Sequence, residues 1–269
     1  MKKLKNTLDL FVTSLPFSYF STPLYLDFAA YTFDRNEEQL VVMQDIVCPH
    51  EFPSLFLPTN PLNWENCSIT FTRAEDIARI RTEEIEILVE KPLDAEYFYA
   101  TEAFVEPAGS FAKKIRSFTS KYTYRVLPSY DRSGIEAFYK NWKTQKKEPS
   151  ITFDESEELY LFCLDHLDDY AIKQVYVEVE GALVGFAWGM AHPNGGWVGL
   201  HLKVDYAYSG LSRFLHHERA KQFASTAQFT LGTGSFEQGI SQYKQELHPS
   251  VVTPYSYILT GGRRAPMAE

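Results

Sequence analysis

A β-hairpin in the second half of the chain constrains the fold more than any other feature of the sequence. Residues 173–190 (KQVYVEVEGALVGFAWGM) contain two alternating apolar runs on either side of Glu180-Gly181. Such runs predict strands with one buried face, and a turn dipeptide that ends in glycine predicts a tight connection between them. We therefore expect the second half to be built around antiparallel strands.

The segments around the hairpin predict further strands and several helices. Strands are expected at 124–130, 196–205, 228–234 and near TPYSYILT, and helices at 133–146, 156–167, 210–224 and near QGISQYKQEL. The helix at 133–146 carries an apolar stripe made of Ile135, Phe138, Tyr139 and Trp142. From about residue 122 the order is strand, helix, helix, three strands, helix, strand, helix, strand, which predicts a mixed α/β fold.

The first third of the chain is also expected to mix strands and helices. Strands are expected at 39–47, 54–58, 84–90 and 95–101. Thr72, with Glu75 three residues later, has capping-box spacing ahead of AEDIARIR, and Ser110 can cap a second helix over 107–122. Aromatic residues crowd the segment 17–33. They favour a packed interface between two domains, and a ligand groove is the alternative.

Composition and the chain's start argue against several classes of protein. The cysteines are odd in number and form no C-x-x-C pair, which argues against a disulfide framework or a zinc site: Cys48, Cys67 and Cys163. The basic N-terminal stretch is interrupted by Asp9 and Pro16, so it does not match a signal peptide. No run of 18 apolar residues exists. We expect a cytoplasmic protein without a membrane span or a metal site.

One basic segment stands out in an otherwise acidic chain. The net charge of −9 argues against indiscriminate nucleic-acid binding by the whole surface. Between residues 113 and 147, ten basic residues and two acidic ones give +8, which leaves −17 for the remainder. The segment begins with Lys113, Lys114 and Arg116 and is interleaved with aromatic residues. A solvated helix face explains such a segment, and the alternative is a band that binds a polyanion such as tRNA.

Three polar residues at alternate positions mark the strand at 196–205. His201, Lys203 and Asp205 should share one face, because side chains two residues apart in a strand project the same way. A histidine there can act as a base, a lysine can hold a carbonyl or phosphate, and an aspartate can orient either. These three are therefore the candidate catalytic residues, and a solvated edge is the alternative.

The polar face of this strand needs polar surroundings. Helices on one side of the sheet bury the apolar face, so the polar face has to meet water, a ligand or the other domain. Burying an unpaired lysine or aspartate costs several kcal/mol. We therefore expect a cavity bounded by the loop at 232–240 and by Trp188 or Tyr208. On the next helix, His216 and His217 are interpreted as surface residues.

Four segments carry a family resemblance. They are AEYFYATEAFVEPAGSFAKKIRSFTSKY (95–122), YKNWKTQK (139–146), GGWVGLHLKVDYAYSGLSRFLHHERAK (195–221) and LGTGSFEQGISQYKQELHP (231–249). In this order they resemble the C-terminal domain of phosphatidylglycerol lysyltransferases, which also occurs as stand-alone bacterial proteins of unknown function. That group is similar to the Fem-type aminoacyltransferases, which carry two tandem halves like the Gcn5-related N-acetyltransferase (GNAT) fold. The GNAT fold is a mixed sheet with helices on both faces, and the element order after residue 122 matches it.

The resemblance has implications for domains, chemistry and site residues. It implies a first GNAT-like half at 1–121 and a second at 122–269. It implies transfer of an acyl or aminoacyl group to an amine or hydroxyl, and in lysyltransferases the donor is aminoacyl-tRNA. It also implies a substrate-lining loop and helix that contain Gly234, Ser235, Gly239 and Lys244.

The resemblance leaves the donor open. GNAT enzymes hold the coenzyme A pyrophosphate on a loop of type Q/R-x-x-G-x-G/A at a helix N-terminus. The equivalent segment here, 204–211, has one glycine and lacks the basic start, which weakens acyl-coenzyme A as the donor. Our leading hypothesis is an acyl- or aminoacyltransferase that uses a tRNA-linked or otherwise phosphate-bearing donor and a small-molecule or peptide acceptor. The alternatives are a coenzyme A-dependent N-acetyltransferase and a non-catalytic binding or scaffold protein.

Overall fold

The computed structural model describes residues 17–28, 54–56, 64–66, 68–145, 151–234 and 238–263. The chain divides into two compact units. Unit 1 takes residues 1–97, 232–245 and 251–269, and unit 2 takes residues 98–231 and 246–250. The predicted boundary between residues 121 and 122 lies inside unit 2, so the two tandem halves proposed from the sequence are not these units, and their relationship stays a prediction.

A seven-stranded sheet has the order β10-β4-β9-β8-β7-β6-β5. Its strands are β4 (Glu96–Ala100), β5 (Tyr124–Leu127), β6 (Lys173–Val179), β7 (Ala182–Ala191), β8 (Trp197–Val204), β9 (Gln228–Thr233) and β10 (Val251–Thr253). Strands β5 to β8 are antiparallel neighbours, whereas β8 and β9 are parallel. The division between the two units runs within β4 and β9.

The predicted hairpin is confirmed as β6 and β7. Their pairing extends from Val179–Ala182 to Lys173–Gly189. Glu180 and Gly181 both have positive φ, 53° and 80°, which the tight two-residue turn requires. The turn therefore follows from the local sequence.

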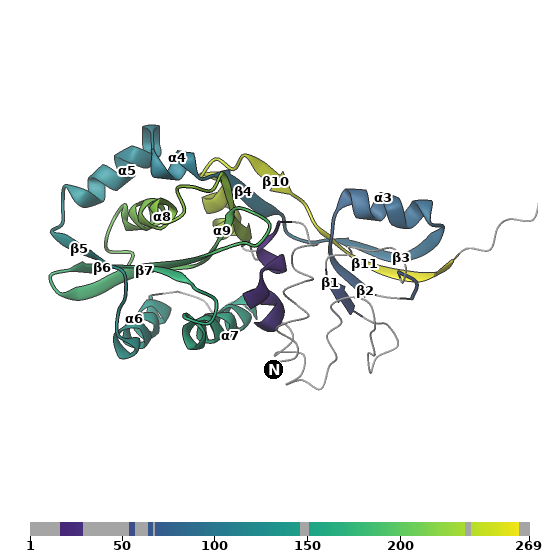
Figure 1. The fold of residues 1–269 in the computed structure, drawn as a ribbon, viewed down its shortest axis with the longest axis horizontal. Helices are drawn as coiled ribbons and strands as arrows, with labels where there is room; N and C mark the ends of the chain where they lie inside the picture. The colour runs from purple at the N-terminus through teal and green to yellow at the C-terminus, as the bar shows by residue number, and fades with distance from the viewer. Residues whose placement is uncertain are drawn as a thin grey trace, which may run out of the picture. The chain divides into compact units, whose positions relative to one another are not determined.

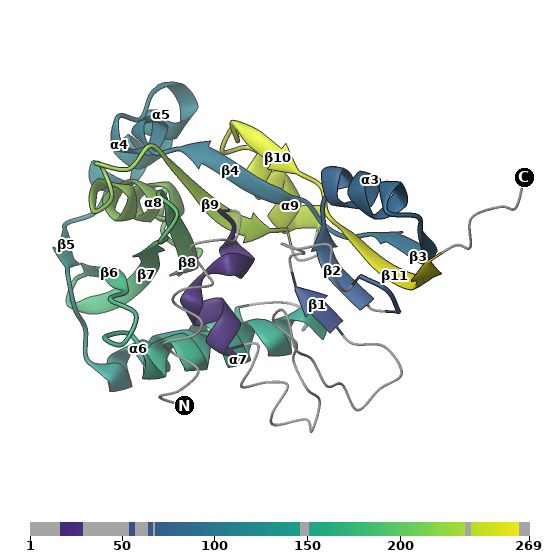
Figure 2. The same cartoon turned by 45° about the vertical axis from the view of Figure 1, so that its right-hand side comes forward.

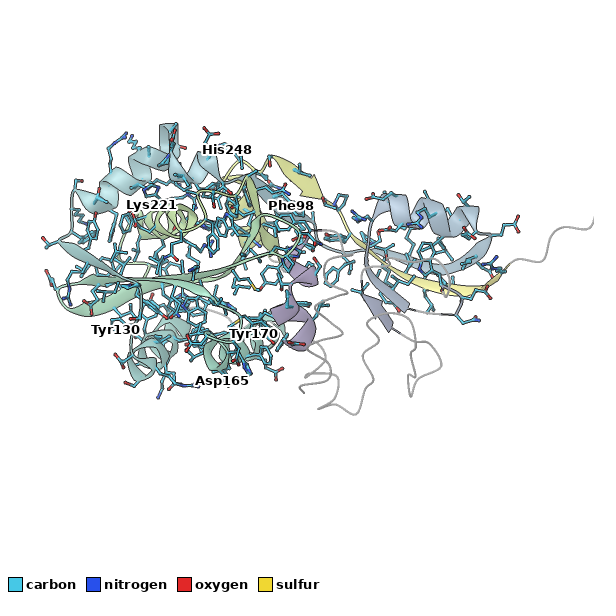
Figure 3. All side chains as sticks on the ribbon, viewed as in Figure 1. Phe98, Tyr130, Asp165, Tyr170, Lys221 and His248 are labelled. Atoms are coloured by element: carbon cyan, nitrogen blue, oxygen red, sulfur yellow. The ribbon has the colours of Figure 1, made fainter. Side chains whose placement is uncertain are left out.

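Helices cover both faces of the sheet in unit 2, as Figures 1 and 2 show. The helices of this unit are α4 (Glu102–Val105), α5 (Gly109–Thr119), α6 (Arg132–Thr144), α7 (Ile151–Asp165) and α8 (Leu211–Lys221). Alternate residues of β7 show the two layers. Phe186 contacts the ring of Phe138 on α6, whereas a Cβ at Gly185 would lie 3.0 Å from Leu215 of α8. Lys221 of α8 and Asp165 of α7 accordingly lie on opposite sides of the strands (Figure 3).

The core on the α8 side of unit 2 is aliphatic and aromatic. It contains Phe118, Val175, Val177, Val179, Val184, Ala187, Val204, Leu211, Phe214 and Leu215. The predicted stripe of α6 faces the other side, where Ile135, Phe138, Tyr139 and Trp142 are all buried. One predicted detail is wrong: Ser110 does not cap α5, which begins at Gly109 after Ala108 as N-cap.

Unit 1 contains a four-stranded sheet with the order β1-β2-β11-β3. Its elements are β1 (Ser54–Phe56), β2 (Ser68–Thr72), α3 (Ala74–Thr82), β3 (Ile85–Pro92), α9 (Gln238–Gln245) and β11 (Ser256–Arg263). The N-cap of α3 is Arg73, one residue after the predicted Thr72. The backbone N–H of Arg73 donates to the Asp76 carboxylate at 3.2 Å. The strand predicted at 39–47 lies outside the described residues.

The described part of the aromatic segment packs inside unit 1. A short 3-10 helix, η1 (Tyr19–Ser21), precedes a helical stretch at 23–28. Phe20 stacks on Phe71 with ring centroids 3.7 Å apart. The buried carboxylate of Glu96 accepts hydrogen bonds from the Ser18 hydroxyl, the Tyr19 N–H and the Tyr255 hydroxyl, each 2.7 Å long. These bonds anchor the segment from Phe17 to Phe28 to β4 and connect it with Tyr255, the residue before β11.

Replacing Gly210 with Ala will destabilise unit 2 by about 2 kcal/mol or more. Gly210 has φ of +88°, and a Cβ there would lie 2.1 Å from the Lys114 carbonyl oxygen. Gly181→Ala is the matched control, because its φ of +80° is similar while nothing lies within 4 Å of its Cβ position. Urea denaturation of both variants separates the clash from the backbone strain. Equal losses of stability would contradict the close approach of α5 to Gly210.

The described helices include none that is long and apolar enough to cross a membrane. In the same residues, no group of three or more His, Cys, Asp or Glu side chains is arranged to hold a metal ion. Cys163 is buried as a free thiol.

Candidate functional site

The parallel strands β8 and β9 pair over a short length in unit 2. Trp197 faces Phe229 and Val198 faces Thr230, and no later pair is formed between the two strands in the described residues. On its other edge, β8 stays paired with β7 as far as Val204. The recorded register between β8 and β9 thus ends at Val198, whereas that between β8 and β7 continues to Val204. A strand that diverges from its neighbour can bind an extended chain by backbone hydrogen bonds.

A β-bulge interrupts β8 where it leaves β9. Ala187 of β7 faces Leu202, and Gly189 faces Gly199. Two steps along β7 therefore match three steps along β8, which places one extra residue at Leu200–His201. Bulges of this kind re-aim side chains and are common beside functional sites.

His201 lies inside the layer formed by α6 and α7. Its ring makes edge contacts with Tyr160 at 5.8 Å and Trp188 at 5.9 Å, and only 5% of the residue is exposed. Burial, together with the smaller effect of the nearby Lys203 charge, lowers the pKa of His201 to about 3. The Nε2 atom has no hydrogen-bond partner among the described residues. The ring is therefore neutral at pH 7.

Lys203 shares this face of β8, as the strand period predicts. Its ammonium lies 4.2 Å from the ring centroid of Trp142 and 6.0 Å from that of Tyr139. A cation over an aromatic face is stabilised by the ring quadrupole. On the opposite face of β8, Leu202 and Val204 pack into the aliphatic core.

The structure adds a cover that the strand pattern did not predict. Helices α6 and α7 lie over part of the polar face of β8, where His201 is buried against Tyr160 and Lys203 is half-buried over Trp142. Strand alternation cannot reveal this cover, because it depends on where the two helices pack. Asp205 follows the end of β8, and its Oδ1 accepts the Ala207 N–H at 2.9 Å. That bond gives Asp205 a local role in the turn before α8.

The two aromatic residues expected at the site lie on opposite sides of the sheet. Trp188 is fully buried on the α7 side, where it stacks on Tyr160 at 5.5 Å and donates to the Tyr176 hydroxyl at 3.1 Å. Tyr208 packs against the core on the α8 side and contacts Tyr122 at 4.9 Å. Trp188 therefore joins His201 and Lys203, whereas Tyr208 does not.

The basic residues at 113–147 do not form a single band. Lys113, Lys114 and Arg116 are exposed on α5, which packs on α8. Among the later described ones, Lys121 precedes β5, Arg125 belongs to β5, and α6 carries Arg132, Lys140 and Lys143. On the α6 side, acidic residues of α7 neutralise part of the charge: Lys143 pairs with Glu157 at 2.5 Å and Arg132 with Asp165 at 2.7 Å. The α5 cluster of Lys113, Lys114 and Arg116 is thus separate from the cations of α6.

The loop and helix after β9 belong to unit 1. The ammonium of Lys244 is buried and donates to the Thr233 carbonyl. A Cβ at Gly234 would lie 1.9 Å from the Ser241 hydroxyl oxygen, whereas Gly239 has open space around it. Ser235 lies outside the described residues. Lys244 therefore holds the end of β9 against α9, and its predicted contact with a substrate stays a prediction.

The histidine pair of α8 corrects another expectation. His216 is buried, not on the surface, and its Nδ1 lies 3.0 Å from Nη2 of Arg219. His217 is half-buried, and its Nδ1 lies 2.8 Å from the Phe104 carbonyl oxygen. Sequence reasoning also missed the buried Arg219, because a lone arginine on an amphipathic helix gives no signal of the sheet it reaches.

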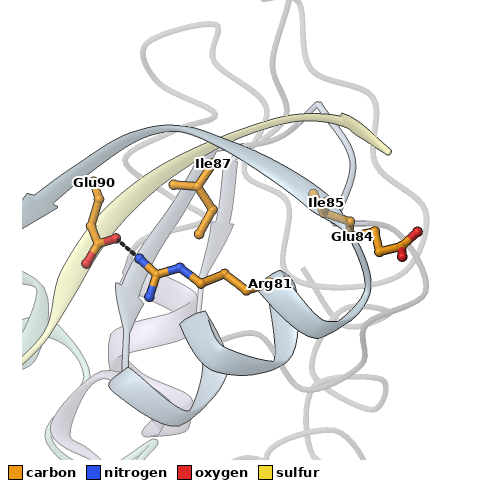
Figure 4. Close-up of a pocket in the computed structure, with 5 residues that line it drawn as sticks. All are labelled: Arg81, Glu84, Ile85, Ile87 and Glu90. Carbon is orange, nitrogen blue, oxygen red and sulfur yellow. Dashed lines mark hydrogen bonds and ion pairs between the residues drawn. The ribbon is translucent and has the colours of Figure 1, made fainter. Parts of the chain in front are cut away.

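Unit 1 has a hollow of about 480 Å³ beside α3 and β3 (Figure 4). It is lined by Arg81, Glu84, Ile85, Ile87 and Glu90. Arg81 and Glu90 form an exposed ion pair at 2.9 Å. An exposed pair of this kind contributes little free energy, and the hollow has no buried polar side chain in its lining, so we do not place the chemistry here.

The fold is similar to those of several solved structures. FemX matches with a TM-score of 0.62 and 11% identity, over 95% of this chain and 96% of that one. L-PGS from Bacillus licheniformis matches with a TM-score of 0.50 and 14% identity, over 72% and 67%. A conserved protein of unknown function from Bacteroides thetaiotaomicron VPI-5482 matches with a TM-score of 0.64 and 15% identity, over 72% and 70%.

The described residues confirm a mixed α/β fold with two sheets, and these likenesses show that L-PGS and FemX have a similar fold. They also support the resemblance to the lysyltransferase C-terminal domain and to Fem-type proteins. At identities of 11–15% they establish the fold and not an activity. No protein-family model and no curated protein matches the sequence.

Proposed function

We propose that this protein transfers an acyl or aminoacyl group to an amine or hydroxyl acceptor at the edge of β8. The observation that carries the proposal is the early separation of β8 and β9 next to the bulge that bears His201. The edge of β8 beyond Val198 can hold the acyl chain in extended form, and the adjacent polar side chains supply charge and hydrogen bonds. Similarity to FemX and L-PGS supports the same class of reaction.

In the proposed reaction, the acceptor nitrogen or oxygen attacks the carbonyl carbon of the donor. The new C–N or C–O bond forms, the ester bond to the donor breaks, and the acceptor proton passes to the leaving oxygen. Lys203 carries the positive charge that the developing oxyanion needs. His201, whose pKa is about 3, is too weak a base to hold the proton at pH 7, so its role is to accept a hydrogen bond.

Aminoacyl-tRNA fits the described residues better than acyl-coenzyme A as the donor. A helix N-terminus that binds a pyrophosphate needs open backbone N–H groups. At the start of α8, the Lys114 carbonyl oxygen of α5 lies 2.1 Å from the position of a Gly210 Cβ, so α5 crowds this end of the helix. The same α5 exposes Lys113, Lys114 and Arg116, which can contact the phosphates of a nucleic acid.

A non-catalytic binding function is the second candidate. It is favoured by the burial of His201 and by the stacking of Lys203 on Trp142, because both contacts also serve the packing of unit 2. The two candidates differ in whether bound aminoacyl-tRNA loses its amino acid.

Replacing Lys113, Lys114 and Arg116 with Ala will weaken binding of aminoacyl-tRNA and flatten its salt dependence. If each side chain neutralises one phosphate, the slope of log K against log salt falls by about 2 to 3. Filter binding of total aminoacyl-tRNA at salt concentrations from about 50 to about 200 mM measures the slope. The matched control changes three exposed lysines elsewhere in unit 2 to Ala: Lys140, Lys173 and Lys221.

The same preparation tests the reaction itself. Labelled aminoacyl-tRNA is incubated with the protein and the small-molecule fraction of a cell extract. The acid-soluble label that appears as a new amide or ester is then measured. Transfer supports the enzyme, and binding without transfer supports the second candidate. Absence of tRNA binding, together with binding of acetyl-coenzyme A, would overturn the proposed donor.

A further inference from the structure

We propose that Arg219 is a positioning residue that holds the β8 bulge and thereby aims His201 and Lys203. The inference rests on the proposed function for its catalytic consequence, whereas its structural part can be tested without any activity. Arg219 belongs to α8, on the side of the sheet opposite to the rings of Tyr160 and Trp142, and only 1% of it is exposed.

The guanidinium of Arg219 bonds to the irregular part of the strand pair. Its Nη1 donates to the Trp188 carbonyl at 2.9 Å and approaches the His201 carbonyl at 3.5 Å. Trp188 and His201 lie between the flanking pairs Ala187–Leu202 and Gly189–Gly199, where the ladder is interrupted. A buried carbonyl without a ladder partner costs free energy, and a charged donor compensates for it more strongly than a neutral one.

Further contacts fix the direction of the guanidinium. Nη2 donates to Nδ1 of His216 at 3.0 Å, because arginine is always the donor in such a pair. The guanidinium carbon lies 5.4 Å from the ring centroid of Trp197, the residue at which β8 is still paired with β9. One side chain therefore connects the paired start of β8, its bulge and the helix behind it.

Two glycines leave the space that Arg219 occupies. A Cβ at Gly199 would lie 2.6 Å from Nη2 and 2.8 Å from Cζ of Arg219, and also 2.5 Å from Cδ2 of Leu231. A Cβ at Gly189 would lie 3.3 Å from Cδ of Arg219. Both glycines belong to the residue pair next to the bulge. The absence of side chains at this pair is what allows a buried cation to reach the backbone of β8.

The consequence concerns the polar face of β8. His201 carries the carbonyl near Arg219 and the ring that contacts Tyr160 and Trp188, so a shift of its backbone re-aims its ring. Lys203 follows two residues later on the same face. Displacements of about 1 Å at reacting groups can lower rates by about 100-fold. Arg219 thus acts through the backbone and does not itself need to touch a substrate.

Arg219→Lys and Gly199→Ala test the proposal from two sides. The first keeps the charge but removes the planar fork, and the second keeps Arg219 but occupies its space. In protein labelled at histidine, both variants should shift the His201 ring resonance, which is assigned by its loss in His201→Gln. Where transfer is measurable, kcat should fall roughly tenfold to 100-fold with KM nearly unchanged. Lys221→Met, an exposed change on the same helix, is the control.

The outcomes separate the positioning role from the proposed function. A His201 resonance unchanged in both folded variants overturns the positioning role, whatever the activity. If the His201 resonance shifts in the variants but the wild-type protein transfers nothing, the positioning role stands and the proposed function is overturned. If Gly199→Ala does not fold, Arg219→Lys alone decides, because it adds no atoms next to β8.

Discussion

Acidification from pH 6.5 towards pH 3 will destabilise the protein through His201, and His201→Gln will remove this part of the pH dependence. Burial lowers the pKa of the ring from 6.5 to about 3 in the folded state. Below pH 6.5 the unfolded state therefore binds a proton that the folded state does not, so the stability gained from the neutral ring is lost as the pH falls. A difference of this size corresponds to a few kcal/mol, on the order of 1.4 kcal/mol for each pH unit.

Urea denaturation of the wild type and of His201→Gln at several pH values measures this effect. The difference between the two free energies of unfolding should favour the wild type most above pH 6.5 and shrink as the pH falls towards 3. His166→Gln is the control, because His166 lies in a partly exposed surface contact with Asp169. A difference that stays constant with pH would falsify the burial of a neutral His201 ring between Tyr160 and Trp188.

Lys203→Met will lower transfer by about 100-fold and leave the thermal midpoint nearly unchanged. The loss follows from removing the cation that is proposed to stabilise the oxyanion, a contribution of about 10²- to 10³-fold in comparable sites. Stability should change little, because methionine retains most of the side-chain length and its sulfur packs well on aromatic rings such as Trp142.

Two further variants complete this experiment. Lys203→Arg keeps a cation over Trp142 and should retain part of the activity, whereas Lys140→Met removes an exposed cation of α6 and should have no effect. The measurements are single-turnover transfer from labelled aminoacyl-tRNA and a thermal melt of each variant. A lower melting temperature together with lost activity in Lys203→Met would show that Lys203 is structural. Full activity in Lys203→Met would remove Lys203 from the proposed site.

Local sequence patterns predicted the elements of this protein well. The hairpin of β6 and β7, the buried stripe of α6 and the alternation of β8 are all found, because each depends on the period of a single element. The positions of caps were less predictable. The N-cap of α3 is Arg73, one residue after the expected Thr72, and the N-cap of α5 is Ala108, two residues before the expected Ser110. Neighbouring polar residues compete for a cap, and the sequence alone does not rank them.

The candidate site could be predicted only in part. The sequence determined that His201 and Lys203 share a face, since β-strand geometry requires it, and that a basic segment begins at Lys113. Tertiary structure alone decided that α6 and α7 cover that face, that acidic residues of α7 neutralise the cations of α6, and that Arg219 reaches the bulge of β8 through the space left by Gly199. The physical reason is the same in each case. Periodicity sets the direction of a side chain within its own element, whereas burial, charge pairing and hydrogen bonding depend on which distant segment packs against it.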